Sequence, residues 1–597
     1  MTQVTVYRVL SAAMLALCLS GISGHALDQL DFQVQTTDTS MTDDLRAASG
    51  LVAAETAKQT NALQLLTDAR AEYGKLIGTL YAKGYYGPVI HVLVDGREAA
   101  DIAPLDAPAA ITRIVVTVDP GPAFTFGRAE VAPLASKTIL PPGFATGQIA
   151  ASGQVQTAVQ ASVDGWRAQG YAKAAVSAQD VQADHINSTL NAVIGIEAGP
   201  RLRFGPLTVN GRQRMRLERI LAIAGLPEGA RFDPAIEERT AERLRRTGVF
   251  SSVSLTEDDA ITPPDLLGIT VDLVEAKRRR YTFGAEVASA DGATLSASWL
   301  DRNARGGGER LEFTGEISGI GAQTGGADYS LGVTYDRPAT FTPDTVLNLG
   351  AGISRINDID NTANLANLSI GFTQYFGKTL TGTAAFAFSA SEGTDAAGNY
   401  AYRALELPIG AVWDRRDSKT EPTRLFYLDA EAKPFYGFGS TDNGLKLTFD
   451  ARAYKGLGEN RVVLAARIQG GAILGADILH TPRADLFYSG GGGTVRGQTY
   501  QSLGVTVDDN GTPVTIGGNQ FLAGSLEARV KVTEKIGIVG FVDMGLVGVQ
   551  GGDNDWQAGA GLGVRYATGV GPVRLDLALP VRSGNGLQVY VGLGQAF

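Results

Sequence analysis

The pattern of apolar and polar positions divides the chain into two regions with different periodicities. Residues 27 to about 277 carry a self-similar unit with a period of roughly 80 residues. In each unit a helical stretch ends in glycine, at Gly84, Gly170 and Gly248, where a helix C-cap favours a positive φ. Alternating strands follow, and second strands are expected at 114–118, 190–196 and 269–274. The pattern predicts three α+β units of order β-α-α-β-β, over residues 27–118, 119–200 and 201–277.

Two interpretations of these units remain open. The units are either spacers or binding modules whose sheet edges accept an extended segment of another chain.

From Tyr281 onward helical periodicity gives way to short alternating runs separated by Gly, Asn, Asp and Thr. In 445–454, for example, leucine, phenylalanine and alanine alternate with polar and charged residues. A soluble β-sandwich also alternates, but it rarely needs so many strands. At roughly 20 residues per membrane strand with its turn or loop, the region is long enough for about 16 strands. We therefore expect an antiparallel transmembrane β-barrel of about 16 strands over residues 278–597.

Composition narrows the function classes. The chain contains 75 glycines but only 4 histidines, and its net charge is −10. This charge argues against nucleic acid as a partner, because binding to phosphates requires clustered Lys and Arg. The three histidines beyond the N-terminus, His91, His185 and His480, lack metal-ligand spacing, and the chain has no nucleophile or nucleotide motif. The sequence predicts neither an enzyme nor a metal or cofactor site.

The N-terminus has the features of a secretory signal peptide. Arg8 precedes an apolar run, and small residues flank a cleavage site after Ala26, so residues 1–26 are expected to be removed. The only cysteine, Cys18, lies inside this segment, so the mature chain should contain no disulfide. A terminal aromatic, Phe597, closes an amphipathic strand, as in many outer-membrane barrels. The pattern favours the outer membrane of a Gram-negative bacterium.

A series of motifs in the last third resembles a known family. The loop sequence 490–498 contains Val495, Arg496 and Gly497, and four further motifs follow at 525–529, 541–545, 571–576 and 593–597. Together, and in this order, they resemble the closing part of the BamA/TamA superfamily of outer-membrane assembly factors. The N-terminal units resemble the periplasmic POTRA domains of that superfamily by pattern.

The resemblance implies a specific arrangement inside the barrel. The loop arginine, Arg496, would fold into the lumen and pair with Asp543 and Glu527, which lie in strand motifs that also contain Phe541 and Gly545. A guanidinium fork suits such carboxylates. Gly497 would allow a tight turn. Gln498 departs from the family's aromatic residue at this position. The alternative is a solvated loop arginine.

The seam of the barrel is a second candidate site. Closure would pair the first strand, near 281–287, with the last, in which Gly592 and Gly594 add no side-chain packing. A weak seam before Phe597 would open sideways to a client strand, as the resemblance implies. Alternatively, these glycines only relieve crowding or fit a bend.

Three POTRA-like units before a 16-stranded barrel are similar to the TamA branch of the superfamily. This implies a TamB-like, inner-membrane-anchored partner that docks on the POTRA units, by our hypothesis on the first one. It also implies a role in assembling autotransporters and other outer-membrane proteins from unfolded clients at the lipid bilayer. The alternative is a two-partner-secretion pore that passes substrate through its lumen. The short, polar segment 27–44 contains no convincing plug helix for such a pore, and a porin would leave the loop motif unexplained.

Overall fold

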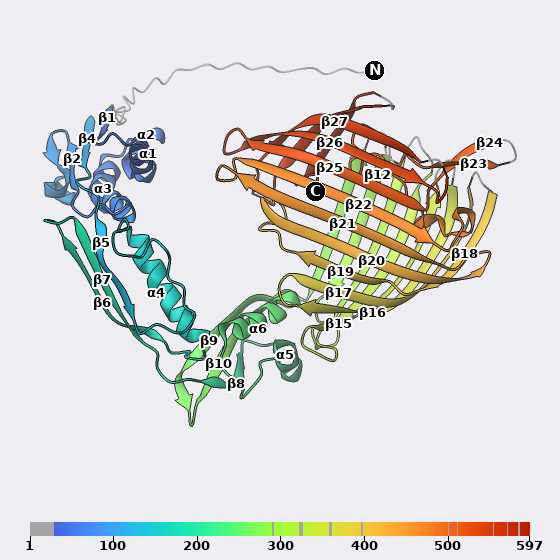
Figure 1. Ribbon diagram of the computed structural model, residues 1–597, viewed down its shortest axis with the longest axis horizontal. Coiled ribbons are helices and arrows are strands. Elements are labelled where there is room, and N and C mark those ends of the chain that lie inside the picture. The colour runs from blue at the N-terminus through green and yellow to red at the C-terminus, as the bar shows by residue number, and fades with distance from the viewer. Residues whose placement is uncertain are drawn as a thin grey trace, which may run out of the picture. The chain divides into compact units, whose positions relative to one another are not determined.

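The computed structural model describes residues 29–597 except 289–291, 322–325, 358–360, 396–397, 500, 510–511, 553, 570 and 583–585 (Figure 1). The predicted signal peptide, residues 1–26, lies outside the described residues. The described chain forms two compact units. The first ends at Arg203 and includes 231–234, and the second comprises 204–230 and 235–597.

The first small sheet is covered by helices. Its strands have the order β1-β4-β2-β3, with β1 parallel and β2 antiparallel to β4. Leu45, Leu76, Leu80 and Val116 belong to its buried core. The elements are β1 (Gln29–Val34), α1 (Thr39–Ala48), α2 (Gly50–Thr56), α3 (Ala62–Ala82), β2 (Val89–Val94), β3 (Arg97–Glu98), two 3-10 turns (Ala99–Asp101 and Pro104–Asp106) and β4 (Arg113–Asp119).

The second small sheet has the order β5-β7-β6, again with the first strand parallel to the last. Its elements are β5 (Thr125–Ala132), α4 (Ser152–Arg167), β6 (Ala175–Asp184) and β7 (Thr189–Glu197). The predicted pair of helices is wrong here, because α4 is the one helix among the described residues of this unit. Segment 133–151 contains three prolines, which cannot donate a helical hydrogen bond.

The third small sheet, of order β8-β10-β9, carries two helices as predicted. Its elements are β8 (Arg203–Asn210), α5 (Leu217–Ala224), α6 (Pro234–Arg246), β9 (Phe250–Thr262) and β10 (Leu266–Glu275). The predicted glycine caps are confirmed in all three sheets, because φ is +88° at Gly84, +97° at Gly170 and +68° at Gly248. The β7 and β10 strands cover the predicted second strands 190–196 and 269–274, and β4 covers 114–118.

A single large antiparallel sheet follows and forms the wall of a β-barrel (Figure 1). Consecutive strands pair with their neighbours in the order of the sequence. The strands are β11 (Arg279–Ala288), β12 (Gly292–Asp301), β13 (Arg310–Ile320), β14 (Asp328–Arg337), β15 (Thr345–Asn357), β16 (Asn361–Phe376), β17 (Leu380–Asp395), β18 (Gly398–Glu406), β19 (Ile409–Asp414), β20 (Arg424–Gly439), β21 (Gly444–Leu457), β22 (Val462–Leu474), β25 (Gln520–Lys531), β26 (Ile536–Gly548), β27 (Asp555–Tyr566), β28 (Val573–Pro580) and β29 (Gln588–Leu593).

The predicted barrel of about 16 strands is confirmed in the described part of the chain. The sheet contains seventeen named strands, but β18 and β19 both pair with β17 and with β20, so they are two pieces of one spanning strand. The interruption falls at Leu407 and Pro408, where proline has no N–H to donate to the ladder. Sixteen spanning strands result.

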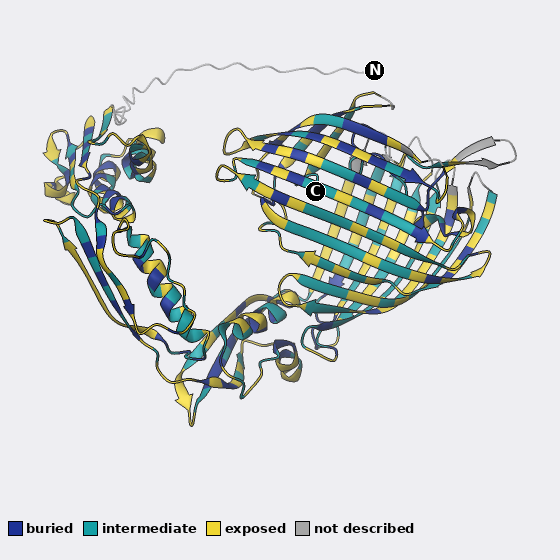
Figure 2. Cartoon of the chain, in the orientation of Figure 1, coloured by how far each residue is buried: buried dark blue, intermediate teal, exposed yellow. Residues whose placement is uncertain are grey.

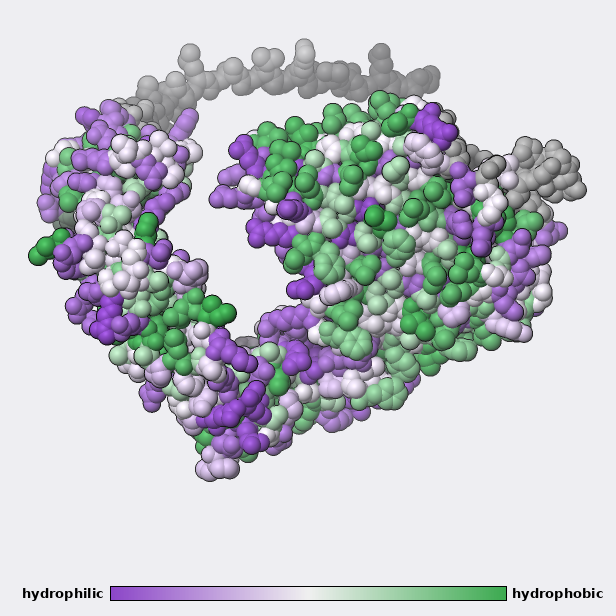
Figure 3. Space-filling view, viewed as in Figure 1, coloured by the Kyte–Doolittle hydropathy of each residue, from purple (hydrophilic) through white to green (hydrophobic). Residues whose placement is uncertain are grey.

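The two faces of the barrel wall differ in polarity. On β21, the outer face exposes Leu447 and Phe449. The residues that alternate with them point inward, where Lys446, Asp450 and Arg452 make ion pairs. Figure 2 shows the resulting alternation of exposed and less exposed positions along the strands, and Figure 3 shows hydrophobic side chains gathered on the outer wall. Such a wall suits lipid outside and water inside.

The two edges of the large sheet are β11 and β29. Among the described residues no ladder joins them, which differs from the predicted pairing across the seam. The physical reason lies in β29, which pairs with β28 over only six residues before Gly594 adopts a φ of +88° and turns the chain away.

The third small sheet contacts the barrel through α6. Asp344, in the turn between β14 and β15, accepts hydrogen bonds from Arg243 (Nε to Oδ1, 2.9 Å) and Arg246 (Nη2 to Oδ1, 3.2 Å). Partial burial would raise the pKa of Asp344, but the hydrogen bonds and charges of the two arginines outweigh it and hold the pKa below its ordinary value.

Among the described helices none is both long and apolar enough to cross a membrane.

Candidate functional site

The long loop between β22 and β25, residues 475–519, carries the candidate site into the barrel. It contains two 3-10 turns (Ile478–His480 and Arg483–Asp485) and the hairpin β23 (Val505–Asp509) and β24 (Thr512–Ile516). Part of the loop packs against the inner wall, where Ile478, Leu486 and Ile516 form a cluster with Ala404 and Phe435. The apolar contacts place the loop inside the barrel rather than over it.

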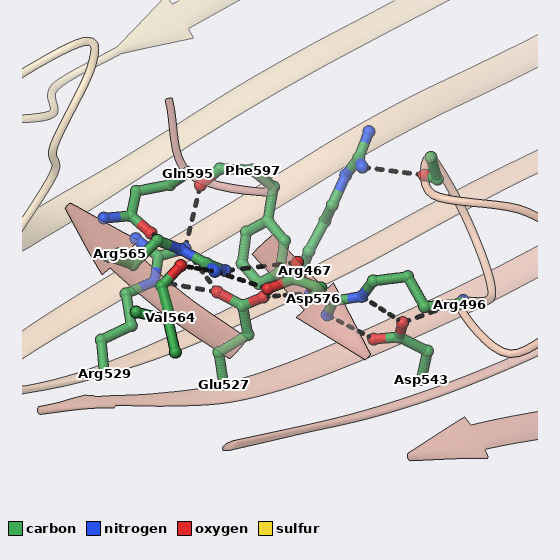
Figure 4. A network of polar contacts seen from close by, with 11 residues as sticks. Arg467, Arg496, Glu527, Arg529, Asp543, Val564, Arg565, Asp576, Gln595 and Phe597 are labelled. Carbon is green, nitrogen blue, oxygen red and sulfur yellow. Dashed lines mark hydrogen bonds and ion pairs between the residues drawn. The ribbon is translucent and has the colours of Figure 1, made fainter. Parts of the chain in front are cut away.

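Arg496 is the most buried cation of this loop, with 2% of its surface exposed. Its fork binds both oxygens of Asp543 on β26, with Nε to Oδ2 at 2.7 Å and Nη2 to Oδ1 at 2.9 Å. Nη1 reaches Glu527 Oε1 on β25 at 2.7 Å and Asp576 Oδ2 on β28 at 3.3 Å (Figure 4). One side chain of the loop thus bonds to three strands.

The surroundings of Arg496 stabilise its charge. The ring of Phe541 lies below the guanidinium, with 3.5 Å between the guanidinium carbon and the ring centroid, so the π face adds a further attraction. Burial opposes the charged form, but the hydrogen bonds and charges of Asp543 and Glu527 outweigh it and raise the pKa of Arg496 above its ordinary value.

Two strand arginines complete the charge balance of the cluster. Arg529 donates from Nε to Glu527 Oε2 at 2.9 Å, and Arg565 pairs with Asp576 (Figure 4). Three arginines therefore face three carboxylates, each of them almost fully buried. A buried ion cluster is tolerable only when its charges are paired and hydrogen-bonded in this way.

Glycines shape the turn that holds Arg496. Gly497 has a φ of +98°, and a Cβ there would lie 2.7 Å from the carbonyl oxygen of Leu579. On β27, a Cβ at Gly559 would lie 1.7 Å from the carbonyl oxygen of Arg496, so only glycine admits the loop backbone. Tyr590 of β29 closes the turn, since its hydroxyl accepts from Gly497 N (3.0 Å) and donates to Gln498 O (3.2 Å).

The segment after β29 also turns to the inside. Arg565 donates from Nε to Gln595 Oε1 at 3.0 Å, and Arg529 donates from Nη2 to the carbonyl oxygen of Phe597 at 3.0 Å. The Phe597 ring is buried against Tyr454. The same arginines that balance the Arg496 cluster therefore hold the end of the last strand.

A second anchor holds the loop on the strands just before β22. Asp485 pairs with Lys433 on β20 and with Lys446 on β21, the latter at 3.0 Å from Nζ to Oδ1. Lys433 also approaches Glu406 Oε2 of β18 at 3.3 Å. The amine of Lys446 lies 5.1 Å from the ring centre of Phe487 in the same loop.

The structure brings together most of the residues singled out in the sequence. Arg496, Glu527, Asp543 and Phe541 are in direct contact. Gly545 makes room for Val495, because a Cβ there would lie 2.8 Å from Val495 Cγ2.

The seam glycines lie apart from this cluster and have local roles. A Cβ at Gly592 would lie 2.8 Å from Arg574 Nε, and Gly594 supplies the bend after β29. Phe597 instead joins the inner wall through Arg529.

Several residues of the cluster escaped the sequence reasoning. The alternation of β28 indicates that Asp576 faces inward, but nothing in the sequence identifies Arg496 and Arg565 as its partners. The roles of Gly559, Tyr590 and Asp485 follow from the path of the loop through the barrel. The alternation of apolar and polar residues does not predict that path. Among the described residues, no group of three or more His, Cys, Asp or Glu could hold a metal ion.

Comparisons with known proteins agree with this architecture. The family model of the Omp85 superfamily domain matches residues 303–597. The outer membrane protein assembly factor BamA of Nitratidesulfovibrio vulgaris is 24% identical over 453 residues, which are 72% of this chain and 55% of that protein, so the chain spans about half the length of this relative.

A solved structure shares the fold. BamA from Haemophilus ducreyi lacking POTRA domains 1-3 superposes with a TM-score of 0.59 at 16% identity, covering 79% of this chain and 98% of that one. Members of the superfamily are outer-membrane proteins of Gram-negative bacteria with periplasmic POTRA domains, and this chain is accordingly an outer-membrane barrel with a POTRA-like periplasmic region. The matched domain, the barrel and its order of motifs show that residues 303–597 form an Omp85 superfamily domain of the BamA/TamA type.

Proposed function

We propose that this protein assembles and inserts other outer-membrane proteins through the lateral seam between β11 and β29. The single observation that supports this most is the absence of a ladder between these two edge strands in the described part of the barrel. An unpaired edge inside a membrane leaves N–H and C=O groups without partners, which is costly in hydrocarbon. A client strand that pairs with the edge removes this cost by β-augmentation.

The inward turn after β29 supplies a physical reason for the open seam. Arg529 and Arg565 bind Phe597 and Gln595 inside the barrel, so these residues cannot extend β29 along β11. The loop cluster around Arg496 uses the same two arginines through Glu527 and Asp576. We infer that the loop keeps this part of the wall in register while the seam exchanges partners.

Disulfide locking tests the seam directly. Because Cys18 is the only cysteine and lies in the predicted signal peptide, new cysteine pairs can be placed without interference. A panel pairs Phe283 or Ala285 of β11 with Val589 or Val591 of β29. The purified full chain in lipid vesicles then receives a urea-denatured eight-stranded outer-membrane barrel, whose insertion is followed by its heat-modifiable mobility on gels.

A matched control locks two strands that are already paired. Phe283 lies opposite Ala297 in the β11–β12 ladder, so a cysteine pair there cross-links the same strand without spanning the seam. We expect seam locks to stop insertion and reductant to restore it, while the control lock leaves the rate unchanged. Normal insertion by a fully oxidised seam lock would refute lateral insertion.

We further propose that residues 27–118, 119–200 and 201–277 are three POTRA units and that a TamB-like partner docks on the first of them. The first sheet ends in two edges, β1 and β3, that could accept an extended strand. Deletion of 27–118 should abolish co-purification of a TamB-like partner. The proposal fails if the deleted protein, folded as judged by its heat-modifiable barrel, still retains that partner.

We also propose that autotransporters are among the clients. This proposal rests on the number of POTRA-like units, because three such units before a 16-stranded barrel are similar to the TamA branch. Passage of substrate through the lumen receives less support, because loop 475–519 packs against the inner wall and is bonded to it at Arg496 and Asp485. The locking experiment separates the two functions, since a conduit would continue to pass substrate with a closed seam. No enzymatic step is part of the proposal.

A further inference from the structure

Four polar residues stand together on the outer face of the barrel, near the strand ends opposite to the turn that contains Asp344. They are Arg355 of β15, Asn364 of β16, Glu392 of β17 and Arg403 of β18, and all four are exposed. The strand register aligns them, because Asn364 lies opposite both Arg355 and Glu392, and Arg403 lies opposite Ala390, two residues before Glu392. Charged side chains on the membrane side of a barrel are costly unless something compensates them.

The side chains next to them along the strands establish which face this is. Tyr402 donates its hydroxyl to the carbonyl oxygen of Leu479 in the loop inside the barrel (2.7 Å), and Ala404 packs against that loop. Successive strand residues point to opposite faces, so Arg403 between them points outward. In the same way Ser389 bonds to the inward Glu406, which places Ala390 and Glu392 outside.

The four residues surround a groove of about 460 Å³ in the outer wall. Its floor is formed by small side chains, among them Ala366, Ala390 and Ala401, which are the reason that the wall is hollowed here. Leu331 and Ile353 form an apolar margin toward β14 and β15.

A second groove, of about 370 Å³, lies next to the first along the same strands. Its lining belongs to the next row of paired residues. Leu368, Phe388 and Leu405 each lie two positions from Ala366, Ala390 and Arg403 on the same strand, in the same direction in space. This second groove is almost entirely apolar. A polar groove near the membrane surface thus continues into an apolar groove at greater depth.

We propose that the two grooves together form a binding site for one membrane lipid with a phosphate in its headgroup. The guanidinium groups of Arg355 and Arg403 bind the phosphate, for which the planar fork of arginine is suited. Glu392 accepts a hydrogen bond from a hydroxyl or ammonium of the same headgroup, and an acyl chain lies along Leu368 and Phe388. The net charge of the three ionised side chains is positive, which selects an anionic lipid over an uncharged one.

Native mass spectrometry of the full chain tests this site, with dioleoyl phosphatidylglycerol as the probe and dioleoylglycerol as the lipid without phosphate. We expect one phosphatidylglycerol to remain bound to the wild type. The double variant Arg355→Gln/Arg403→Gln should need an about ten-fold or higher lipid concentration, because each lost charge-assisted hydrogen bond is worth about 1.5–3 kcal/mol, or roughly ten-fold or more in affinity. Dioleoylglycerol should not be retained.

Two further variants make the result specific to the grooves. Ala390→Phe fills the polar groove without changing charge and should also release the lipid. Arg424→Gln/Arg461→Gln removes two exposed arginines elsewhere on the barrel and should bind as the wild type does. Each variant is first checked for heat-modifiable mobility. Equal binding by the groove variants, or equal retention of dioleoylglycerol, would overturn the proposal.

Discussion

Replacement of Arg496 by alanine tests the role of the buried cluster most directly. The change leaves Asp543 without the cation that binds both of its oxygens, while Glu527 and Asp576 keep Arg529 and Arg565. The substitution leaves two arginines facing three carboxylates in the cluster. Asp543 is only 1% exposed in the intact cluster, so its carboxylate depends on protein partners rather than on bulk water.

Breaking a buried ion pair from one side costs about 3–5 kcal/mol. We expect the lower end of this range, about 3 kcal/mol, because two of the three carboxylates stay paired. This equals a reduction of the folding equilibrium constant by a factor of about 100. With a urea m-value of about 3 kcal/mol/M, the unfolding midpoint should fall by about 1 M.

The assay is urea unfolding of the full chain in lipid vesicles, followed by loss of heat-modifiable mobility. Arg496→Ala/Asp543→Asn should recover part of the loss, because it also removes the unpaired carboxylate charge, and the exposed Arg424→Ala should leave the midpoint unchanged. A midpoint for Arg496→Ala within about 0.2 M of the wild type, less than 1 kcal/mol, would show that the loop arginine does not stabilise the barrel.

Three further predictions follow from single contacts. Gly497→Ala should lower the same midpoint through about 1–3 kcal/mol of backbone strain at its positive φ, whereas Gly493→Ala, with open space around it, should not; equal midpoints would contradict this. Because the pKa of Asp344 is depressed below 3.8, the stability from its pairing with Arg243 is present above that pH and is lost as the pH falls below it. The midpoint of wild type should therefore fall more between about pH 5 and about pH 3 than that of Asp344→Asn, and parallel curves would count against the contact. Asp485→Asn should leave Lys433 and Lys446 with Glu406 as their one nearby carboxylate among the described residues and make loop 475–519 more sensitive to protease; an unchanged cleavage rate would exclude the second anchor.

Much of the fold could be predicted from local patterns. The three glycine caps and the strands after them depend on neighbouring residues, as does the alternation along β21 that separates Lys446 from Leu447. The prediction of two helices in the second unit was wrong. Its general pattern resembles that of the other two units, but prolines in segment 133–151 prevent a helix before α4. Contacts between distant parts of the chain could not be predicted in this way. The unpaired seam, for example, follows from the inward turn at Gly594 and not from any periodicity of the sequence.

The candidate site was predictable only in part, for the same reason. The motif at Arg496 and the inward carboxylates at 527 and 543 could be matched through the family resemblance, which fixes their order. Asp485 and its lysines carry no motif and come together only because the loop crosses the lumen. Gly559 belongs to a glycine-rich strand whose glycines look equivalent in sequence, although one of them lies against the loop backbone.

The two anchors of the loop make the barrel mechanically asymmetric. The hydrogen bonds and ion pairs described for loop 475–519 reach β18, β20, β21, β22, β25, β26, β28 and β29. The loop between Asp485 and Arg496 thus acts as a strap along this half of the wall, from β20 to β28, and the half cannot widen without breaking a buried ion pair. Any expansion that admits a new strand must then be taken up by β11 to β17, so the untied half moves and the strapped half serves as its fixed frame.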